Sequence, residues 1–423
     1  MIPISLFVVL LLIGTPIAFV LGLTACTHLV TMGGVADFSV VIQRLFAGLN
    51  NSSFMCIPFF VLAGNLMNKT GITEKIIAFT RELVSTIRGG MAYVVVLVAM
   101  FLSAVLGSAN AVTAILCSML IPYMVEDGFD EDFSAGLIAG SGVLGPVIPP
   151  SVPFVIYGSL AGLSVSKLFL GGVVPGLLIG LGNMIVIMIC SRKRSYKRFR
   201  DHYDLKALLI AFVKAIPALM IPVIIIGGIL SGIFTPTESG AVACGVAVIS
   251  GIISRKLKIG DFISAAVEAA ITTGSIMIII AFGNILGWTL ALDQVPASVV
   301  SFIGSITNSW QVVMLLIIGI LMVVGCVMDG FSALYIFAPV MITLTSAYGI
   351  DQVHFGLIFN LIMNVGLITP PVGMVLFIAS NVSGVPFHKL CRTVLPFTIV
   401  SFVVAFALAF LPQITLWLPN LLS

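Results

Sequence analysis

Backbone carbonyl groups are the first candidates for chemistry in this chain, because a proline-interrupted helix sequence occurs twice in apolar surroundings. The copies are residues 145–153 (GPVIPPSVP) and 366–374 (GLITPPVGM), and the proline pairs beginning at Pro149 and Pro370 lie 221 residues apart. Successive prolines remove backbone donors and interrupt a helix. Such a break persists in a membrane only where it is buried in protein or lines a solvated cavity. Two matched breaks therefore indicate a transport site.

The oxygen atoms near the two breaks suit sodium, a small hard cation. An unwound helix offers carbonyls without helical partners, and Ser, Thr and Asn side chains can complete a ligand shell. The candidate sodium ligands are Ser108, Asn110, Gly145, Val147 and Pro150 in the first half, and Gly366, Thr369 and Pro371 in the second. Candidates for contact with the substrate or for coupling are Ser151, Asp329 and Ser332. Helix N-termini facing the same cavity carry partial positive charge and favour a carboxylate substrate.

Two acidic residues near the breaks each have two interpretations. Asp329 is a functional candidate because intramembrane carboxylates are costly, but it could equally cap the helix that follows it. Glu238 lies in Thr-Pro-Thr-Glu, which is typical of a helix start with a capping-box carboxylate. The four His are too dispersed for a metal site or a proton relay.

The composition predicts an all-α polytopic membrane protein. Apolar residues make up 60% of the 423 residues, charged residues make up 8%, and the mean hydropathy is +1.25, far from the balance of a soluble domain. Stretches long enough to span a bilayer include residues 4–23, 173–190, 216–230 and 396–418. No basic segment precedes the first apolar run, so a cleaved signal peptide is not expected.

The densest basic segment, residues 191–206 (SRKRSYKRFRDHYDLK), orients the chain. Loops rich in Lys and Arg remain on the cytoplasmic side of a membrane. We therefore expect a multi-pass protein of the bacterial inner membrane with this segment inside the cell. A membrane protein needs such a signal for its orientation, so no nucleic-acid partner is expected.

Each break follows the same pattern, which predicts two repeats. In each half, two apolar arms too short to span comfortably flank a small polar tip, as in a re-entrant hairpin. The predicted organisation is a first repeat over 1–190, a basic connector over 191–214 and a second repeat over 215–423. The hairpins are expected at about 91–126 and 312–348, and the discontinuous helices at about 130–160 and 351–381. The repeats are inverted if each half crosses the membrane an odd number of times.

Motifs along most of the chain resemble those of the large membrane subunit of tripartite ATP-independent periplasmic (TRAP) transporters. They are residues 57–67 (IPFFVLAGNLM), 107–110 (GSAN), 145–153, 232–238 (GIFTPTE) and 366–373 (GLITPPVG). The resemblance runs from near residue 10 to near residue 400, with the motifs in order.

The resemblance implies a sodium symporter that works by an elevator mechanism. A transport domain made of the hairpins and broken helices would slide against a scaffold of the other helices. The implied partners are a separate small membrane subunit of four helices and a periplasmic binding protein that delivers a carboxylate, of the sialic acid or C4-dicarboxylate type. By motif match, the sodium sites carry over to Ser108, Asn110, Gly145 and Pro150, and to Gly366, Thr369 and Pro371.

Three other functions remain open from the residues. A proton-coupled transporter would use Asp329 or Glu238 as its carrier. An anion or dicarboxylate exchanger of similar design would need no binding protein. An intramembrane enzyme is disfavoured, because the sequence contains no HExxH, GxSxG or clustered acidic pair.

Overall fold

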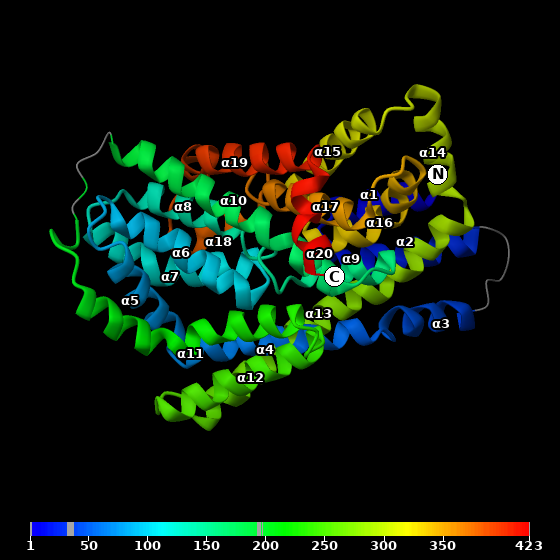
Figure 1. Ribbon diagram of the computed structural model, residues 1–423. Coiled ribbons are helices and arrows are strands. Elements are labelled where there is room, and N and C mark those ends of the chain that lie inside the picture. Colours follow the sequence, from blue (N-terminus) through cyan, green and yellow to red (C-terminus); the bar gives the residue numbers. More distant parts are fainter. Residues whose placement is uncertain (1, 32–37, 193–195, 197, 423) are drawn as a thin grey trace.

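The computed structural model describes residues 2–31, 38–192, 196 and 198–422, and these residues form helices and connecting turns without any β-strand (Figure 1). The all-α prediction is confirmed. Of the predicted basic connector, residues 193–195 and 197 lie outside the described part. Within the described residues, eight helices are long and apolar enough to cross a membrane, or nine if one bent pair counts as a single span.

One group of helices comes from the beginning and the middle of the chain. Its members are α1 (Ile2–Leu12), α2 (Ile17–Thr31), α3 (Phe38–Leu49), η1 (Ser52–Met55), α4 (Cys56–Lys69), α11 (Leu205–Leu230), α12 (Pro236–Ile253) and α13 (Ile259–Leu292). Helix α13 packs along α2, α3 and α4, and α12 packs on α4 and α11. The predicted single span over 4–23 is wrong: α1 ends at Leu12 and α2 begins at Ile17, because Pro16 cannot continue the first helix.

A second group contains the segments predicted as hairpins and broken helices. Three of the predicted hairpin arms are by themselves long and apolar enough to cross a membrane, which differs from the expectation of arms too short to span. From the first half come α6 (Gly90–Leu106), α7 (Ala109–Glu126), α8 (Glu131–Gly142), α9 (Val152–Ala161) and α10 (Val165–Arg192). From the second half come α15 (Trp310–Val327), α16 (Gly330–Ala347), α17 (Gln352–Gly366), α18 (Met374–Ser383), α19 (Phe387–Ala409) and α20 (Pro412–Leu422). The predicted span over 396–418 is therefore divided between α19 and α20.

The two halves of the second group are interleaved. Helix α18 of the second half packs on α7 and α8 of the first, and α9 of the first half packs on α16 and α17 of the second. In addition, α19 packs along α8 and α10. Each discontinuous helix thus packs against helices of the other half. This packing places the two breaks in the middle of the molecule.

Two short helices connect the groups. Helix α5 (Ile72–Leu83) contacts both α11 and α6, and α14 (Val295–Ile306) contacts α13 and α16. Helix α5 has one buried apolar side and one charged side, typical of a helix at a membrane surface. No residue of α14 is buried.

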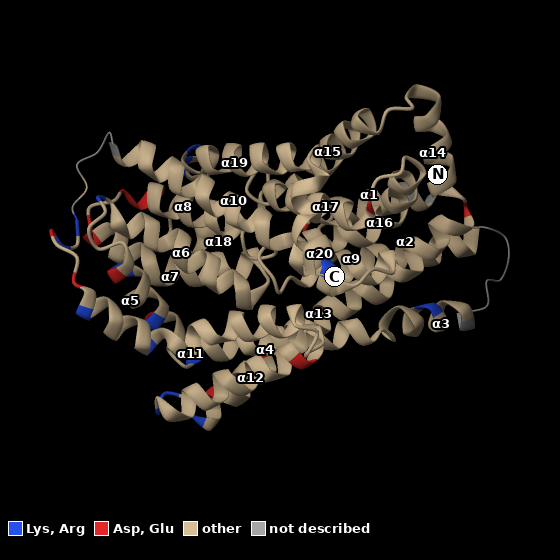
Figure 2. Ribbon diagram, in the orientation of Figure 1, with Lys and Arg blue, Asp and Glu red and all other residues tan. Residues whose placement is uncertain are grey.

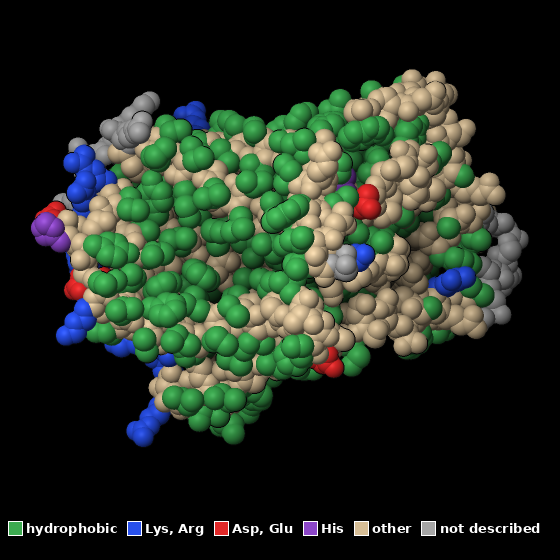
Figure 3. All heavy atoms as spheres, viewed as in Figure 1, with side chains coloured by type: hydrophobic (Ala, Val, Ile, Leu, Met, Phe, Trp, Pro, Cys, Tyr) green, Lys and Arg blue, Asp and Glu red, His purple; other side chains and the backbone are tan. Residues whose placement is uncertain are grey.

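Charged side chains gather at the end of the molecule that holds α5 and the basic connector, on the left of Figure 2, and are sparse elsewhere. Hydrophobic side chains cover the broad face between the two ends in Figure 3. This distribution is typical of a protein surrounded by lipid. By the positive-inside rule, the α5 end faces the cytoplasm.

Candidate functional site

The first break is a buried, non-helical segment between α8 and α9. All residues from Val143 to Ser151 are buried. Ser151 is the N-cap of α9: its Oγ accepts a hydrogen bond from the Phe154 N–H at 3.4 Å and donates one to the Pro146 carbonyl at 2.5 Å. Ser151 therefore has a structural role that ends the break and starts the next helix.

The tip of the first hairpin wraps around this break. A Cβ placed on Gly145 would lie 2.7 Å from the Ser108 carbonyl oxygen, and one on Gly107 would lie 2.8 Å from the Pro150 carbonyl oxygen. Glycine is therefore required at both contacts, because any side chain would separate the tip from the break. Ser108 also caps α7 by accepting a hydrogen bond from the Ala111 N–H at 3.5 Å. The structure thus brings Ser108, Gly145 and Pro150 together.

Several buried oxygen atoms on α6, α7 and α8, the helices that lead into the tip and the break, make no hydrogen bond within the described residues. They are Asn110 Oδ1, Thr113 Oγ1, Ser103 Oγ and Ser141 Oγ. Thr113 Oγ1 lies directly against Gly142 at the end of α8, where a Cβ would overlap it. A buried polar atom without a partner is costly, and each such atom in a native structure calls for a partner such as water or an ion. These oxygens fit a hard cation.

The second break is more open than the first. Thr369 Oγ1 donates to the Val365 carbonyl at 2.7 Å, and Pro370 and Pro371 are exposed. Across from this break, α15 crosses α17 so closely that a Cβ on Gly366 would lie 2.5 Å from Gly325 Cα. The break is also tied to the hairpin by the Gly373 N–H, which donates to the Cys326 carbonyl at 3.3 Å.

Both candidate carboxylates act as helix caps. Asp329 accepts hydrogen bonds from the N–H groups of Phe331 and Ser332 at 3.0 and 3.2 Å, and from Ser332 Oγ at 2.5 Å. Glu238 accepts from the Thr235 N–H at 2.7 Å, and its own N–H donates to Thr235 Oγ1 at 3.3 Å. Both oxygens of Asp329 are therefore already engaged, and the structure pairs Asp329 with Ser332.

Two residues that the sequence did not point to lie at the first break: Asn360 joins the two halves there, and Asn364 bonds to Asn360 within the same helix. Asn360 Nδ2 donates to the Pro146 carbonyl at 2.6 Å, and Asn364 Nδ2 donates to the Asn360 carbonyl at 2.7 Å. Both side chains lie in α17 and are 5% exposed. The available signal was a pair of amides one helical turn apart inside an apolar helix. At a spacing of 221 residues, their counterparts in the first half are Ala139 and Val143.

The arrangement is therefore a buried break that is flanked by helices with unpaired oxygens and supported from the other half by Asn360. The described residues contain no group of three or more His, Cys, Asp or Glu that could hold a metal. The donors available here are carbonyls, hydroxyls and amides, which suit an alkali cation better than a transition metal.

A family model for the DctM component of tripartite ATP-independent periplasmic transporters matches residues 4–414. The sialic acid TRAP transporter large permease protein SiaM of Vibrio cholerae is 36% identical, and the match covers 97% of this chain and 96% of that protein. The C4-dicarboxylate large permease DctM of Pseudomonas aeruginosa is 35% identical, over 90% of this chain and 89% of that protein.

An isethionate TRAP permease, DctMQ of Oleidesulfovibrio alaskensis, is 36% identical over 97% of this chain, and the match spans 65% of that relative's length.

Solved structures share the fold at much lower identity. The Alcanivorax borkumensis YdaH transporter is 12% identical with a TM-score of 0.65, and the match covers 99% of each chain. Neisseria gonorrhoeae MtrF is 11% identical with a TM-score of 0.63, over 98% of this chain and 95% of that one.

The full-length family match and relatives of about this length confirm the resemblance seen in the sequence. The chain belongs to the DctM component family of tripartite ATP-independent periplasmic transporters, as a large permease subunit of the inner membrane that serves transport and not catalysis.

Proposed function

We propose that this subunit imports an organic acid together with sodium, by an elevator movement of its second helix group against its first. The observation that carries the proposal is the set of unpaired buried oxygens where the first hairpin meets the first break, with Asn110 Oδ1 and Thr113 Oγ1 foremost. Sodium bound there would satisfy these oxygens together with carbonyls of the break. The second break would hold a second ion through the carbonyls of Gly366, Thr369 and Pro371.

The substrate in this proposal is a carboxylate or sulfonate. Helices α9 and α18 both begin at a break, so their positive N-terminal ends point toward the middle of the molecule. Relatives of this chain are named for sialic acid, C4-dicarboxylates and isethionate, which are all organic anions. We favour a carboxylate of the sialic acid or C4-dicarboxylate type.

The elevator movement is supported by the division into two helix groups, which meet where α4 packs on α6 and α13 on α16, and through the short helices α5 and α14. No charged residue occurs between residues 91 and 125 or between residues 133 and 165, so a moving body would carry few charges past the lipid. Ion and substrate would travel together and partly neutralise each other. Sodium transport and substrate transport would be coupled if the second helix group moves only when both ligands are bound.

The proposed partners follow from membership of a tripartite family. A small membrane subunit of four helices would pack on the first helix group, and a periplasmic binding protein would deliver the substrate. In this proposal the three components together form the importer.

The test is uptake into proteoliposomes that contain this chain and its small subunit, with the binding protein loaded with sialic acid, a C4-dicarboxylate or isethionate. We expect uptake of one acid to require an inward sodium gradient and to stop when potassium replaces sodium. Equal uptake in potassium would refute sodium coupling. Uptake without the binding protein would instead indicate an exchanger.

Proton coupling is the second candidate, with Asp329 as the carrier. Its two oxygens already accept three hydrogen bonds as the cap of α16, so the structure gives this carboxylate a role in starting the helix. A pH gradient imposed without sodium separates the two cases in the same vesicles.

A further inference from the structure

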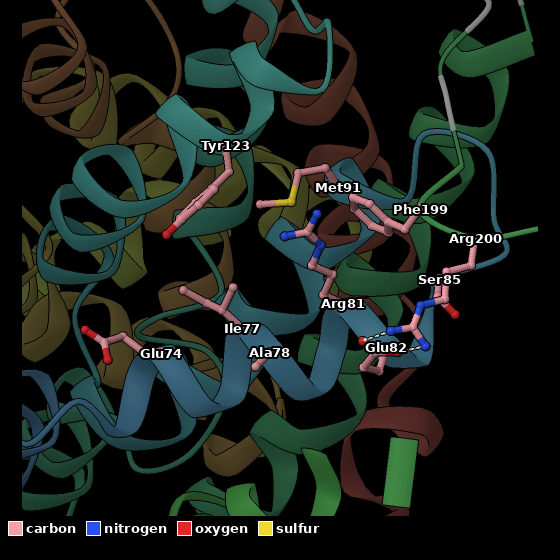
Figure 4. A pocket seen from close by; sticks show the side chains of 10 residues that line it. All are labelled: Glu74, Ile77, Ala78, Arg81, Glu82, Ser85, Met91, Tyr123, Phe199 and Arg200. Atoms are coloured by element: carbon pink, nitrogen blue, oxygen red, sulfur yellow. Dashed lines mark hydrogen bonds and ion pairs between the residues drawn. The ribbon is translucent and has the colours of Figure 1, made fainter. Parts of the chain in front are cut away.

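A cavity lies away from the breaks, at the end of the molecule that holds α5 and the basic connector. It measures about 420 Å³, a size typical of small-molecule sites. Helix α5 forms one wall, and the starts or ends of α6 and α7 and the basic connector form the others. Figure 4 shows Arg81 rising from α5 on the same side as Met91, Tyr123 and Phe199.

Among the described residues that line the cavity, one cation has no carboxylate partner. Glu82 pairs with Arg200 at 3.2 Å, and Glu74 pairs with Lys256 at 2.5 Å, so both acidic residues of the lining are neutralised. Arg81 makes no hydrogen bond or ion pair with any described residue; its guanidinium lies 4.5 Å from the centre of the Phe199 ring. Stacking on an aromatic ring holds a guanidinium in place and leaves its N–H donors available.

Further contacts of the basic connector hold Arg200 in its pair with Glu82. Arg200 also pairs with Asp204 at 3.2 Å, and its backbone N–H donates to the Ser85 carbonyl at 3.0 Å. A hydrogen bond from the Ala207 N–H lowers the pKa of the Asp204 carboxyl, so this carboxylate stays charged at neutral pH. Arg200 is thereby occupied by two carboxylates, and Arg81 remains the available cation.

The other walls are suited to an apolar group. Ile77 and Met91 are 9% and 2% exposed, and Phe199 covers one side of the cavity. Tyr123 adds a ring and a hydroxyl from the end of α7. A ligand for this cavity therefore needs one negative group for Arg81 and a small apolar body for the remaining walls.

We propose that this cavity binds a small organic anion, a carboxylate or phosphate that Arg81 holds through its paired N–H donors. Two sources supply this chemistry at the cytoplasmic membrane surface: a soluble metabolite acid and the headgroup region of an anionic phospholipid. The site is separate from the breaks, so it does not depend on the proposed sodium coupling.

The test measures binding of 4-fluorobenzoate to the purified full chain in phosphatidylcholine nanodiscs, by fluorine NMR. Potassium replaces sodium in the buffer, so that a sodium-dependent transport site stays empty. We expect saturable binding that weakens about tenfold or more in Arg81→Gln, because a charge-assisted bidentate contact is lost. Arg88→Gln is the matched control: Arg88 is an exposed arginine outside the cavity lining, and its loss should leave binding unchanged.

A second variant keeps every charge. Ala78 lines the cavity and is exposed, so Ala78→Leu should fill part of the space and abolish binding without disturbing the fold. Wild-type-like binding in Arg81→Gln and Ala78→Leu would overturn the proposal, as would the absence of saturable binding to the wild type.

Competition then identifies the source. Displacement of 4-fluorobenzoate by inorganic phosphate but not by phosphatidylglycerol in the nanodisc supports a soluble anion, and the reverse supports a lipid headgroup. Failure of both to displace the probe would contradict an anion site.

Discussion

Two amide side chains approach the first break from opposite halves of the chain. Asn110 at the hairpin tip has a buried carbonyl oxygen without a hydrogen-bond partner among the described residues, whereas the Asn360 amide donates to the Pro146 carbonyl and its oxygen accepts from Asn364 Nδ2. The Asn360 amide therefore positions the break, and the unpaired oxygen makes Asn110 the candidate ligand.

Asn110→Ala should therefore weaken sodium binding without unfolding the protein. Removing one oxygen ligand is expected to raise the sodium concentration needed for half of the stabilising effect by about tenfold. The measurement is the rise in unfolding temperature of the purified chain as sodium is added.

Ser118→Ala is the control for this variant. Ser118 lies on the same helix with an exposed hydroxyl bonded back to the Ile115 carbonyl. An identical sodium dependence for Asn110→Ala and Ser118→Ala would exclude Asn110 as a ligand.

At the scale of helices, the site depends on close crossings that only glycine permits. Helices α15 and α17 meet at Gly325 and Gly366, and hairpin tip 107–110 meets the first break at Gly145. These crossings hold the unwound carbonyls in fixed positions. The same requirement explains why both breaks begin with glycine in the sequence.

Gly366→Ala tests the crossing of α15 and α17. The added Cβ would lie 2.5 Å from Gly325 Cα, so the helices must separate, at a cost of about 1–3 kcal/mol in the free energy of unfolding. We expect a lower unfolding temperature and reduced uptake.

Gly319→Ala on α15 is the matched control, because no atom lies within 4 Å of its added Cβ. If both variants behave alike, the close crossing does not matter for the site.

The sequence predicted the helical class and the helix interruptions at the two proline pairs, because prolines, glycines and apolar runs act locally. It did not predict Asn360 and Asn364, since their role depends on α17 packing beside a break 214 residues earlier in the chain. It also placed one span across Pro16, where apolar content masked a helix end. The sodium assignment stays a prediction at every residue proposed for it.

At the scale of the whole molecule, the proposed movement requires the two helix groups to slide past each other. Helix α4 of the first group contacts α6 of the second, where a Cβ on Gly64 would lie 3.6 Å from Leu106 Cα. A fixed link at this contact should hold the groups in one position.

The variant Gly64→Cys with Leu106→Cys supplies such a link, because the two backbones approach closely enough at this contact for a disulfide to form. Oxidation with copper phenanthroline should stop uptake, and reduction should restore it. The two single variants, treated in the same way, control for modification of the seven native cysteines. Undiminished uptake by the cross-linked protein would contradict sliding at this contact.

The most direct test of the central claim follows sodium itself. Proteoliposomes with the complete transporter receive an inward gradient of the transported acid and equal concentrations of radioactive sodium on both sides. The account predicts that sodium accumulates inside above its external concentration, and that Asn110→Ala reduces this accumulation. Acid uptake without any net movement of sodium would contradict it.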